Sequence, residues 1–236
     1  MEFFNDLISG LHGFWSGIVD FAGLFVKYAP SFAKALGMTV EVTFISLILA
    51  TVLGIVFCLF KLSRFGLLKG FANVYISIIR GTPLIVQILF IYFGLPMALH
   101  FTWSIIPASV VIMSLNAGAY MTELIRGGIE AVDKGQLEAA RSLGLTYGQS
   151  LKKIILPQAF RLMLPSIINQ FIITLKDTSL LSILGLRELT QNTKIIVANN
   201  MEAFKMYAIV GIYYWVIVTI LSAVAKMIER RTTYGK

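Results

Sequence analysis

Five apolar stretches, each long enough to cross a bilayer, constrain the fold of this chain more than any other feature. They cover residues 38–60, 84–102, 105–125, 162–185 and 206–227. About 20 apolar residues span the hydrocarbon core as a helix, and lipid offers the backbone no other hydrogen-bond partners. The composition agrees, with 57% hydrophobic and only 14% charged residues. We therefore expect an all-α polytopic membrane protein with five transmembrane helices.

The N-terminal region carries a weaker apolar segment. It runs from about Phe14 to Val26, is interrupted by Asp20 and is followed by Lys27. A segment this short and polar favours an interfacial helix over a sixth span. We accordingly assign residues 1–36 to an extracytoplasmic or interfacial segment and 37–236 to the transmembrane domain. Because no basic start and cleavage site mark a signal peptide, we expect this segment to stay on the mature protein.

The positions of Lys and Arg predict the orientation. Fourteen of them lie between the first and second spans, between the third and fourth, and after the fifth, whereas five lie on the other side. Basic residues in short loops mark the cytoplasmic side. The C-terminus is therefore predicted to be cytoplasmic and the N-terminus outside. The net charge of +8 sets orientation here, and we predict no nucleic-acid site.

The long polar segment of about residues 127–161 is placed in the cytosol by this topology. Asp133 with Gln136, and Thr146 with Gln149, fit the pattern of a helix cap and its third residue, so two short helices are expected. Gly144 stands where the first would end, since glycine accepts the left-handed conformation. Leu137, Ala140 and Leu143 are expected to share an apolar face of that first helix.

Three motifs carry a family resemblance. The segment after Glu138 resembles the EAA signature of membrane subunits of ATP-binding-cassette importers, Ile79–Gln87 reads IRGTPLIVQ, and Leu175–Leu180 reads LKDTSL. Together they resemble the permeases of the polar amino acid uptake branch, which take histidine, glutamine, arginine or cystine. The positions that match the EAA signature are Glu138, Ala139, Ala140, Gly144, Ile154, Leu156 and Pro157.

The resemblance implies a permease fold of the type I importers in a bacterial cytoplasmic membrane. It also implies that the segment from Glu138 to Pro157 contains a coupling helix that docks on a cytosolic ATPase. Further implied partners are a second permease copy or homologue and an extracytoplasmic amino acid-binding protein. Whether the two permeases are identical stays open, as does the identity of the amino acid.

No ATPase site is expected in this chain. The phosphate-binding pattern GxxxxGK[ST] is absent, and the sole Gly-Lys pair ends the sequence. We therefore expect a permease subunit that is not itself an enzyme and has no cofactor, with ATP and Mg²⁺ bound by the partner ATPase. Cys58, the only cysteine, lies in an apolar span and is expected to be a free thiol.

Polar residues in the fourth span predict a substrate site. Lys176 and Asp177 lie within the span, where charge is costly, so they should line a cavity or an interface. An amino acid zwitterion would give a carboxylate to Lys176 and an ammonium to Asp177. The predicted contacts on this span are Gln170, Thr174, Lys176, Asp177, Thr178 and Ser179. A purely structural role for the charged pair is the alternative.

The third span adds Asn116, Tyr120 and Glu123, which share one helical face. Asn116 and Glu123 are further candidate substrate contacts, Glu123 for a cationic side chain. A local ion pair with Arg126 is an equally supported interpretation of Glu123. Arg80 is expected to anchor the second span at the cytosolic surface, just before a helix start at Pro83.

A different class of function would use the same charges. In an ion-coupled secondary carrier, Lys176, Asp177 and Glu123 would relay protons, and no ATPase would be needed. A membrane-embedded enzyme is disfavoured, because His12 and His100 are isolated and no metal-ligand or nucleophile cluster stands out.

Overall fold

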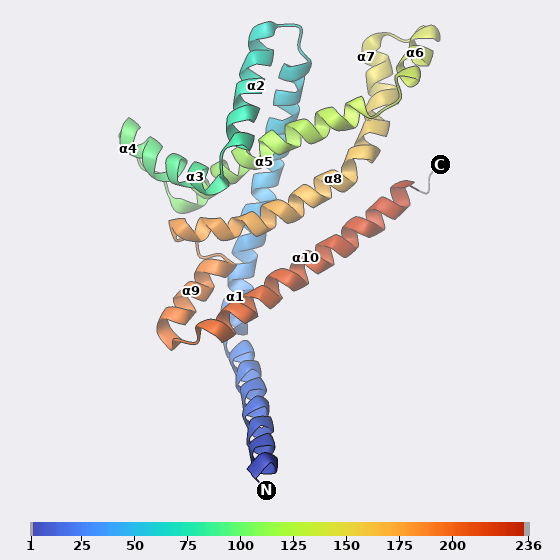
Figure 1. Cartoon of the computed structure of the whole chain (residues 1–236). Coiled ribbons are helices and arrows are strands. Elements are labelled where there is room, and N and C mark those ends of the chain that lie inside the picture. Colours follow the sequence, from blue (N-terminus) through green and yellow to red (C-terminus); the bar gives the residue numbers. More distant parts are fainter. Residues whose placement is uncertain (1, 234–236) are drawn as a thin grey trace.

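The fold is given by a computed structural model that describes residues 2–233, with side chains for residues 15–229 (Figure 1). Expectations that rest on Met1 or Lys236 lie outside the described residues. The elements are α1 (Glu2–Leu62), α2 (Gly66–Gly81), α3 (Leu84–Leu89), a π-helix (Phe90–Gly94), α4 (Leu95–Leu99), α5 (Ile105–Glu130), α6 (Lys134–Ser142), α7 (Tyr147–Ser150), a π-helix (Leu151–Ile155), α8 (Leu156–Asp177), a 3₁₀-helix (Thr178–Leu184), α9 (Leu189–Asn200) and α10 (Ala203–Thr233).

The all-α prediction is confirmed, since no strand occurs between residues 2 and 233. Four helical stretches are long and apolar enough to cross a membrane: Trp15–Leu62, Ile105–Glu130, Tyr147–Leu184 and Ala203–Glu229. A fifth span arises if α2 and α3–α4, which meet at a bend of 110°, are taken together. Counted in this way, the structure has the five spans that the sequence predicts, but the second consists of helices that meet at a bend.

The long helices α1 and α5 pack closely along one another. A Cβ atom on Gly54 of α1 would lie 2.7 Å from Cγ of Met121, and one on Gly118 of α5 would lie 3.1 Å from Cβ of Leu53. Small residues let membrane helices approach this closely, where packing must replace the hydrophobic effect. The α1–α5 pair therefore forms the rigid centre on which the other helices lie.

The N-terminal segment is not separate from the first span. Helix α1 continues from Glu2 to Leu62 without a break at residue 36, and Pro30 lies inside it. Asp20 does not end the helix because its carboxylate pairs with Lys205 of α10. Phe25 and Phe32 stack on Tyr213 of α10. Helix α1 thus has no break at the expected boundary, and the extracytoplasmic or interfacial place of residues 1–36 stays a prediction.

The second expected span, 84–102, is replaced by two helices. Helix α2 returns along α1, and the chain turns at Thr82, whose backbone is extended (φ −120°, ψ 143°). The buried side chain of Gln87 satisfies the end of α2: its Nε2 donates to the carbonyl oxygens of Ile79 (2.8 Å) and Thr82 (3.0 Å). The start of α3 after Pro83 therefore lies at this bend, at the opposite end of α2 from the basic α1–α2 turn, and both Thr82 and Pro83 are exposed.

The basic segments gather at one end of the molecule. The α1–α2 turn, α6, α7 and the end of α10 lie toward the top and right of Figure 1, whereas the N-terminus and α9 lie at the bottom. Tyr147–Leu184 forms one continuous helical path, so the fourth span begins earlier than residue 162. The polar segment is thereby joined directly to the span that carries Asp177.

Candidate substrate pocket and coupling segment

A pocket of about 360 Å³ opens where the α2–α3 junction meets α5 and α8. Its walls combine polar groups with proline and aliphatic carbon. The lining residues are Thr82, Pro83, Leu84, Asn116, Tyr120, Gln170, Ile173 and Asp177. Three of the predicted substrate contacts, Asn116, Gln170 and Asp177, thus come together in one pocket from two helices.

The neutral polar groups of the pocket are held by buried hydrogen bonds. Asn116 donates from Nδ2 to Oε1 of Gln87 at 3.0 Å, which ties α5 to the α2–α3 junction. Gln170 donates to the hydroxyl of Thr174 at 3.3 Å. Buried amides need such partners, and fixed amides give a pocket defined polar directions.

The remaining candidates, on α8 and the 3₁₀-helix that follows it, lie outside the pocket lining. Thr174 and Thr178 are buried, and the Thr178 hydroxyl donates to the Leu175 carbonyl at 2.6 Å. Ser179 is half-buried. Lys176 is exposed and does not line the pocket, since successive helical residues point about 100° apart. Its contact with substrate stays a prediction.

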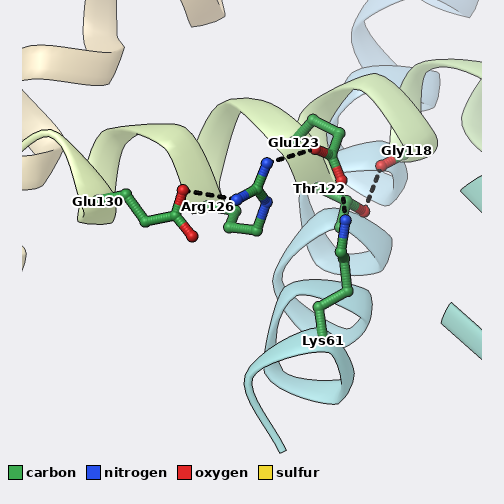
Figure 2. A network of polar contacts seen from close by, with 6 residues as sticks. All are labelled: Lys61, Gly118, Thr122, Glu123, Arg126 and Glu130. Carbon is green, nitrogen blue, oxygen red and sulfur yellow. Dashed lines mark hydrogen bonds and ion pairs between the residues drawn. The ribbon is translucent and has the colours of Figure 1, made fainter. Parts of the chain in front are cut away.

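Glu123 lies in an ion-pair network at the cytosolic end of α5 (Figure 2). One carboxylate oxygen lies 2.5 Å from Nζ of Lys61 on α1, and the other lies 2.9 Å from Arg126. Arg126 also reaches Glu130 at 2.5 Å. Glu123 does not line the pocket, so the structure shows the local ion pair and extends it to a second helix.

The Arg80 side chain lies beside a ring that lines the pocket. It lies at the end of α2, about 21 Å along the helix axis from Gly66, and its guanidinium carbon is 5.4 Å from the ring centre of Tyr120. Gly66 follows the basic α1–α2 turn, so Arg80 lies at the opposite end of α2 from that turn, and its side chain is exposed. The role of Arg80 as an anchor at the cytosolic surface stays a prediction.

The candidate coupling segment, about residues 127–161, has the local structure that the sequence predicts. Asp133 caps α6 through the amide of Gly135, and Thr146 and Gln149 form a complete capping box on α7. Gly144 has a φ of +83°, as expected for the helix end.

The residues that match the EAA signature differ in their exposure to solvent. Ala140 is buried, whereas Glu138, Ala139, Gly144, Leu156 and Pro157 are exposed and Ile154 is half-buried. Leu143 does not join the face of Leu137 and Ala140. It lies beyond the last residue of α6 and is 84% exposed, and Tyr147 is 60% exposed. The segment therefore presents two large apolar side chains to the cytosolic side.

Two buried side chains, Gln87 and Glu188, hydrogen-bond to helix ends and were not predicted from the sequence. Gln87 holds the α2–α3 junction, and its place in the IRGTPLIVQ segment was the available signal. Glu188 caps α9 by accepting from the amides of Thr190 (2.9 Å) and Gln191 (2.7 Å), and the Tyr214 hydroxyl donates to it at 2.9 Å. Burial raises the pKa of Glu188, and these hydrogen bonds oppose that shift. Glu188 was missed because glutamate is not one of the usual cap residues, and because its third partner, Tyr214, lies on α10.

Comparison with known families then identifies the class. The family described as "Binding-protein-dependent transport system inner membrane component" matches residues 46–234. The chain belongs to this family. As an inner membrane component with several spans, it is a multi-pass membrane protein, and the resemblance inferred from the three motifs is confirmed.

Named relatives of this inner membrane component are amino acid permeases. The arginine transport system permease protein ArtQ of Bacillus subtilis is 38% identical over 213 residues, which cover 90% of this chain and 97% of ArtQ. The glutamine transport system permease protein GlnP of Escherichia coli K12 is 41% identical, covering 70% of this chain and 82% of GlnP.

A solved structure shares the whole fold. It is titled "Crystal structure of an amino acid ABC transporter with histidines", is 39% identical, and covers 87% of this chain and 96% of its own with a TM-score of 0.84. This match supports the expected importer permease fold.

Proposed function

We propose that this chain is the membrane-spanning subunit of an ATP-driven importer that carries a polar amino acid across the cytoplasmic membrane. The observation that carries the proposal is the pocket beside the α2–α3 bend, in which Asn116, Gln170 and Asp177 converge. The names of relatives that cover most of the chain support amino acids as the substrate class.

Asp177 supplies the main charge of the site. It is half-buried, and no ion pair among the described residues involves it. A carboxylate so placed is costly unless a cation compensates it, and the α-ammonium or a cationic side chain of an amino acid would do so. The amides of Asn116 and Gln170 offer further hydrogen bonds to a polar ligand.

The coupling segment supports the proposed ATPase partner. Leu143 and Tyr147 stand exposed on a compact pair of capped helices, and exposed apolar groups of this size mark an interaction surface. From α7 to Asp177 the chain is helical throughout, so a displacement of α7 by the ATPase would be transmitted along α8 to Asp177. ATP and Mg²⁺ would be bound by that ATPase.

The remaining proposed partners follow from the family. Its name implies a binding protein, which would deliver the amino acid from the extracytoplasmic side. A second permease, identical or homologous, would complete the pathway.

Substitutions at Asp177 test the site. Asp177→Asn should weaken amino acid uptake by about tenfold or more, because a charge-assisted hydrogen bond contributes about 1.5–3 kcal/mol. Asp177→Glu keeps the charge and should retain part of the uptake. Initial rates against substrate concentration in membrane vesicles give the result, and unchanged kinetics in Asp177→Asn would assign Asp177 to structure.

A further inference from the structure

An apolar pocket of about 250 Å³ lies where the four helices α1, α5, α8 and α10 meet. Among its described lining residues only Thr51 carries a hydroxyl, which donates to the carbonyl of Leu47 in its own helix at 2.8 Å. A pocket of this kind stays dry and takes an apolar ligand. Its lining includes Leu47 and Thr51 of α1, Met121 of α5, Ile168 and Phe171 of α8, and Val224 of α10.

The apolar pocket lies on the side of α5 and α8 that faces away from the substrate pocket. Met121 follows Asn116 by five residues, which is about 140° around α5, and Ile168 precedes Gln170 by two, which is about 160° around α8. A second permease would share the transport pathway and so lie on the side of the substrate pocket. The medium that meets the apolar pocket, between membrane-spanning helices, is therefore lipid hydrocarbon.

The depth of the apolar pocket matches one leaflet of a bilayer. Thr51 lies eleven residues before Leu62 at the end of α1, and Met121 lies nine before Glu130 at the end of α5. These separations are about 16 and 14 Å from the predicted cytosolic ends of the two helices, and half of a hydrocarbon core is about 15 Å. An acyl chain of the cytoplasmic leaflet would therefore reach the pocket.

A positive charge lies on the predicted cytosolic side of the apolar pocket. Arg161 precedes Ile168 by seven residues, which places it on the same side of α8 and about 10 Å nearer the cytosolic end. Its side chain is exposed, and none of the ion pairs among the described residues involves it. The sequence of α10 adds Arg230 and Arg231 beyond the pocket. Basic residues between membrane helices on the cytoplasmic side bind anionic lipid headgroups.

We propose that the apolar pocket binds one acyl chain of an anionic phospholipid, whose phosphate pairs with Arg161. The walls hold the chain by packing, because a lipid tail leaves no water behind when it enters, and Arg161 selects the headgroup. The bound chain fills the space between α10 and the α1–α5 pair. This lipid site lies apart from the substrate pocket and goes beyond the proposed transport function.

The test is photocrosslinking of the full chain, together with the subunits that co-purify, in lipid nanodiscs. The probes are phosphatidylglycerol and phosphatidylcholine that carry the same diazirine-labelled acyl chain and differ in the headgroup. Each is added at the same low mole fraction to phosphatidylcholine discs, and mass spectrometry locates the labelled residues. The shared acyl chain separates selection by the headgroup from simple contact with lipid.

We expect phosphatidylglycerol to label residues 167–171 and 221–228 of the wild type about fivefold more than phosphatidylcholine does, the factor that one arginine near an anionic surface contributes. Arg161→Gln should remove this preference and leave labelling by phosphatidylcholine unchanged. Arg64→Gln, at an exposed arginine of the α1–α2 turn, is the matched control and should preserve the preference.

The substitution Val224→Phe tests the apolar pocket itself. Val224 lines the pocket and is 40% exposed, so a larger side chain there should fill the space and lower labelling of residues 167–171 by both lipids. Val216→Phe is the matched control, because Val216 is 42% exposed on the same helix and does not line the pocket. It should be labelled as the wild type is.

Three results would overturn the inference. Equal labelling by the two lipids in the wild type, or an equal loss in Arg161→Gln and Arg64→Gln, would show contact with lipid that Arg161 does not select. Unchanged labelling in Val224→Phe would place the acyl chain elsewhere. Labelling of the pocket by neither lipid would show that protein covers it. None of these results bears on amino acid uptake, so the proposed function stands or fails separately.

Discussion

The turn at Gly144 gives the sharpest test of the coupling segment. Its φ of +83° lies in the left-handed region, where the amides of Gly144 and Leu145 donate to the carbonyls of Arg141 (3.0 Å) and Ala140 (3.2 Å). A Cβ atom here would meet no other atom within 4 Å. A Cβ therefore fits at this position, and the expected cost of Gly144→Val comes from the left-handed backbone.

The magnitude follows from that conformation. An L-residue in the left-handed region costs about 1–2 kcal/mol, which shifts the population of the turn by about 5- to 30-fold. If the turn must hold α6 and α7 in place for each transport cycle, ATP-dependent uptake should fall by a similar factor. Insertion and expression should not change, because the turn lies outside the spans.

The matched control is Gly70→Val on α2. A Cβ at Gly70 also meets nothing within 4 Å, and its backbone is not in the left-handed region. Uptake of a radiolabelled amino acid into vesicles loaded with ATP compares the two variants at equal protein levels. Equal uptake by Gly144→Val and Gly70→Val would refute the role of the turn in coupling.

Two further substitutions test the packing. Glu188→Ala removes the cap of α9 and should lower the free energy of unfolding by at least about 0.5–2 kcal/mol, measured by thermal unfolding in detergent, with exposed Lys34→Ala as control; equal stability would refute the cap. A double-mutant cycle on Lys61 and Glu123 should give a coupling energy above the about 0.2–1 kcal/mol of exposed pairs, because both side chains are less than 20% exposed. Additive changes in unfolding free energy would show that the pair is energetically silent.

Local signals in the sequence predicted the coupling segment well. The capping box of Thr146 and Gln149 and the left-handed Gly144 depend only on neighbouring residues, so the structure reproduces them. The shared face of Leu137, Ala140 and Leu143 fails at its last member, because the helix ends one residue earlier than that face requires. Helical periodicity therefore predicts a shared face only as far as the helix extends, and the sequence did not give the last residue of α6.

The features that the sequence did not predict depend on contacts between residues far apart in the chain. Apolar content alone cannot show that Gln87 satisfies the end of α2, so the bend at Thr82 was not predicted. Asn116 and Gln170 were placed by helical periodicity, and the pocket brings them together. Of the adjacent pair Lys176 and Asp177, only Asp177 lines the pocket, because a helix turns successive side chains by about 100°.

The central claim is that this inner membrane component works with a cytosolic ATPase. It is tested most directly by purifying the tagged chain gently from its native membrane and identifying the bound proteins by mass spectrometry. We predict that an ATPase with a phosphate-binding GxxxxGK[ST] motif is recovered with it, and that Gly144→Val weakens this recovery or its coupled ATP hydrolysis. Recovery of the chain alone, with amino acid uptake that follows an imposed proton gradient and ignores ATP, would contradict the claim and favour an ion-coupled carrier.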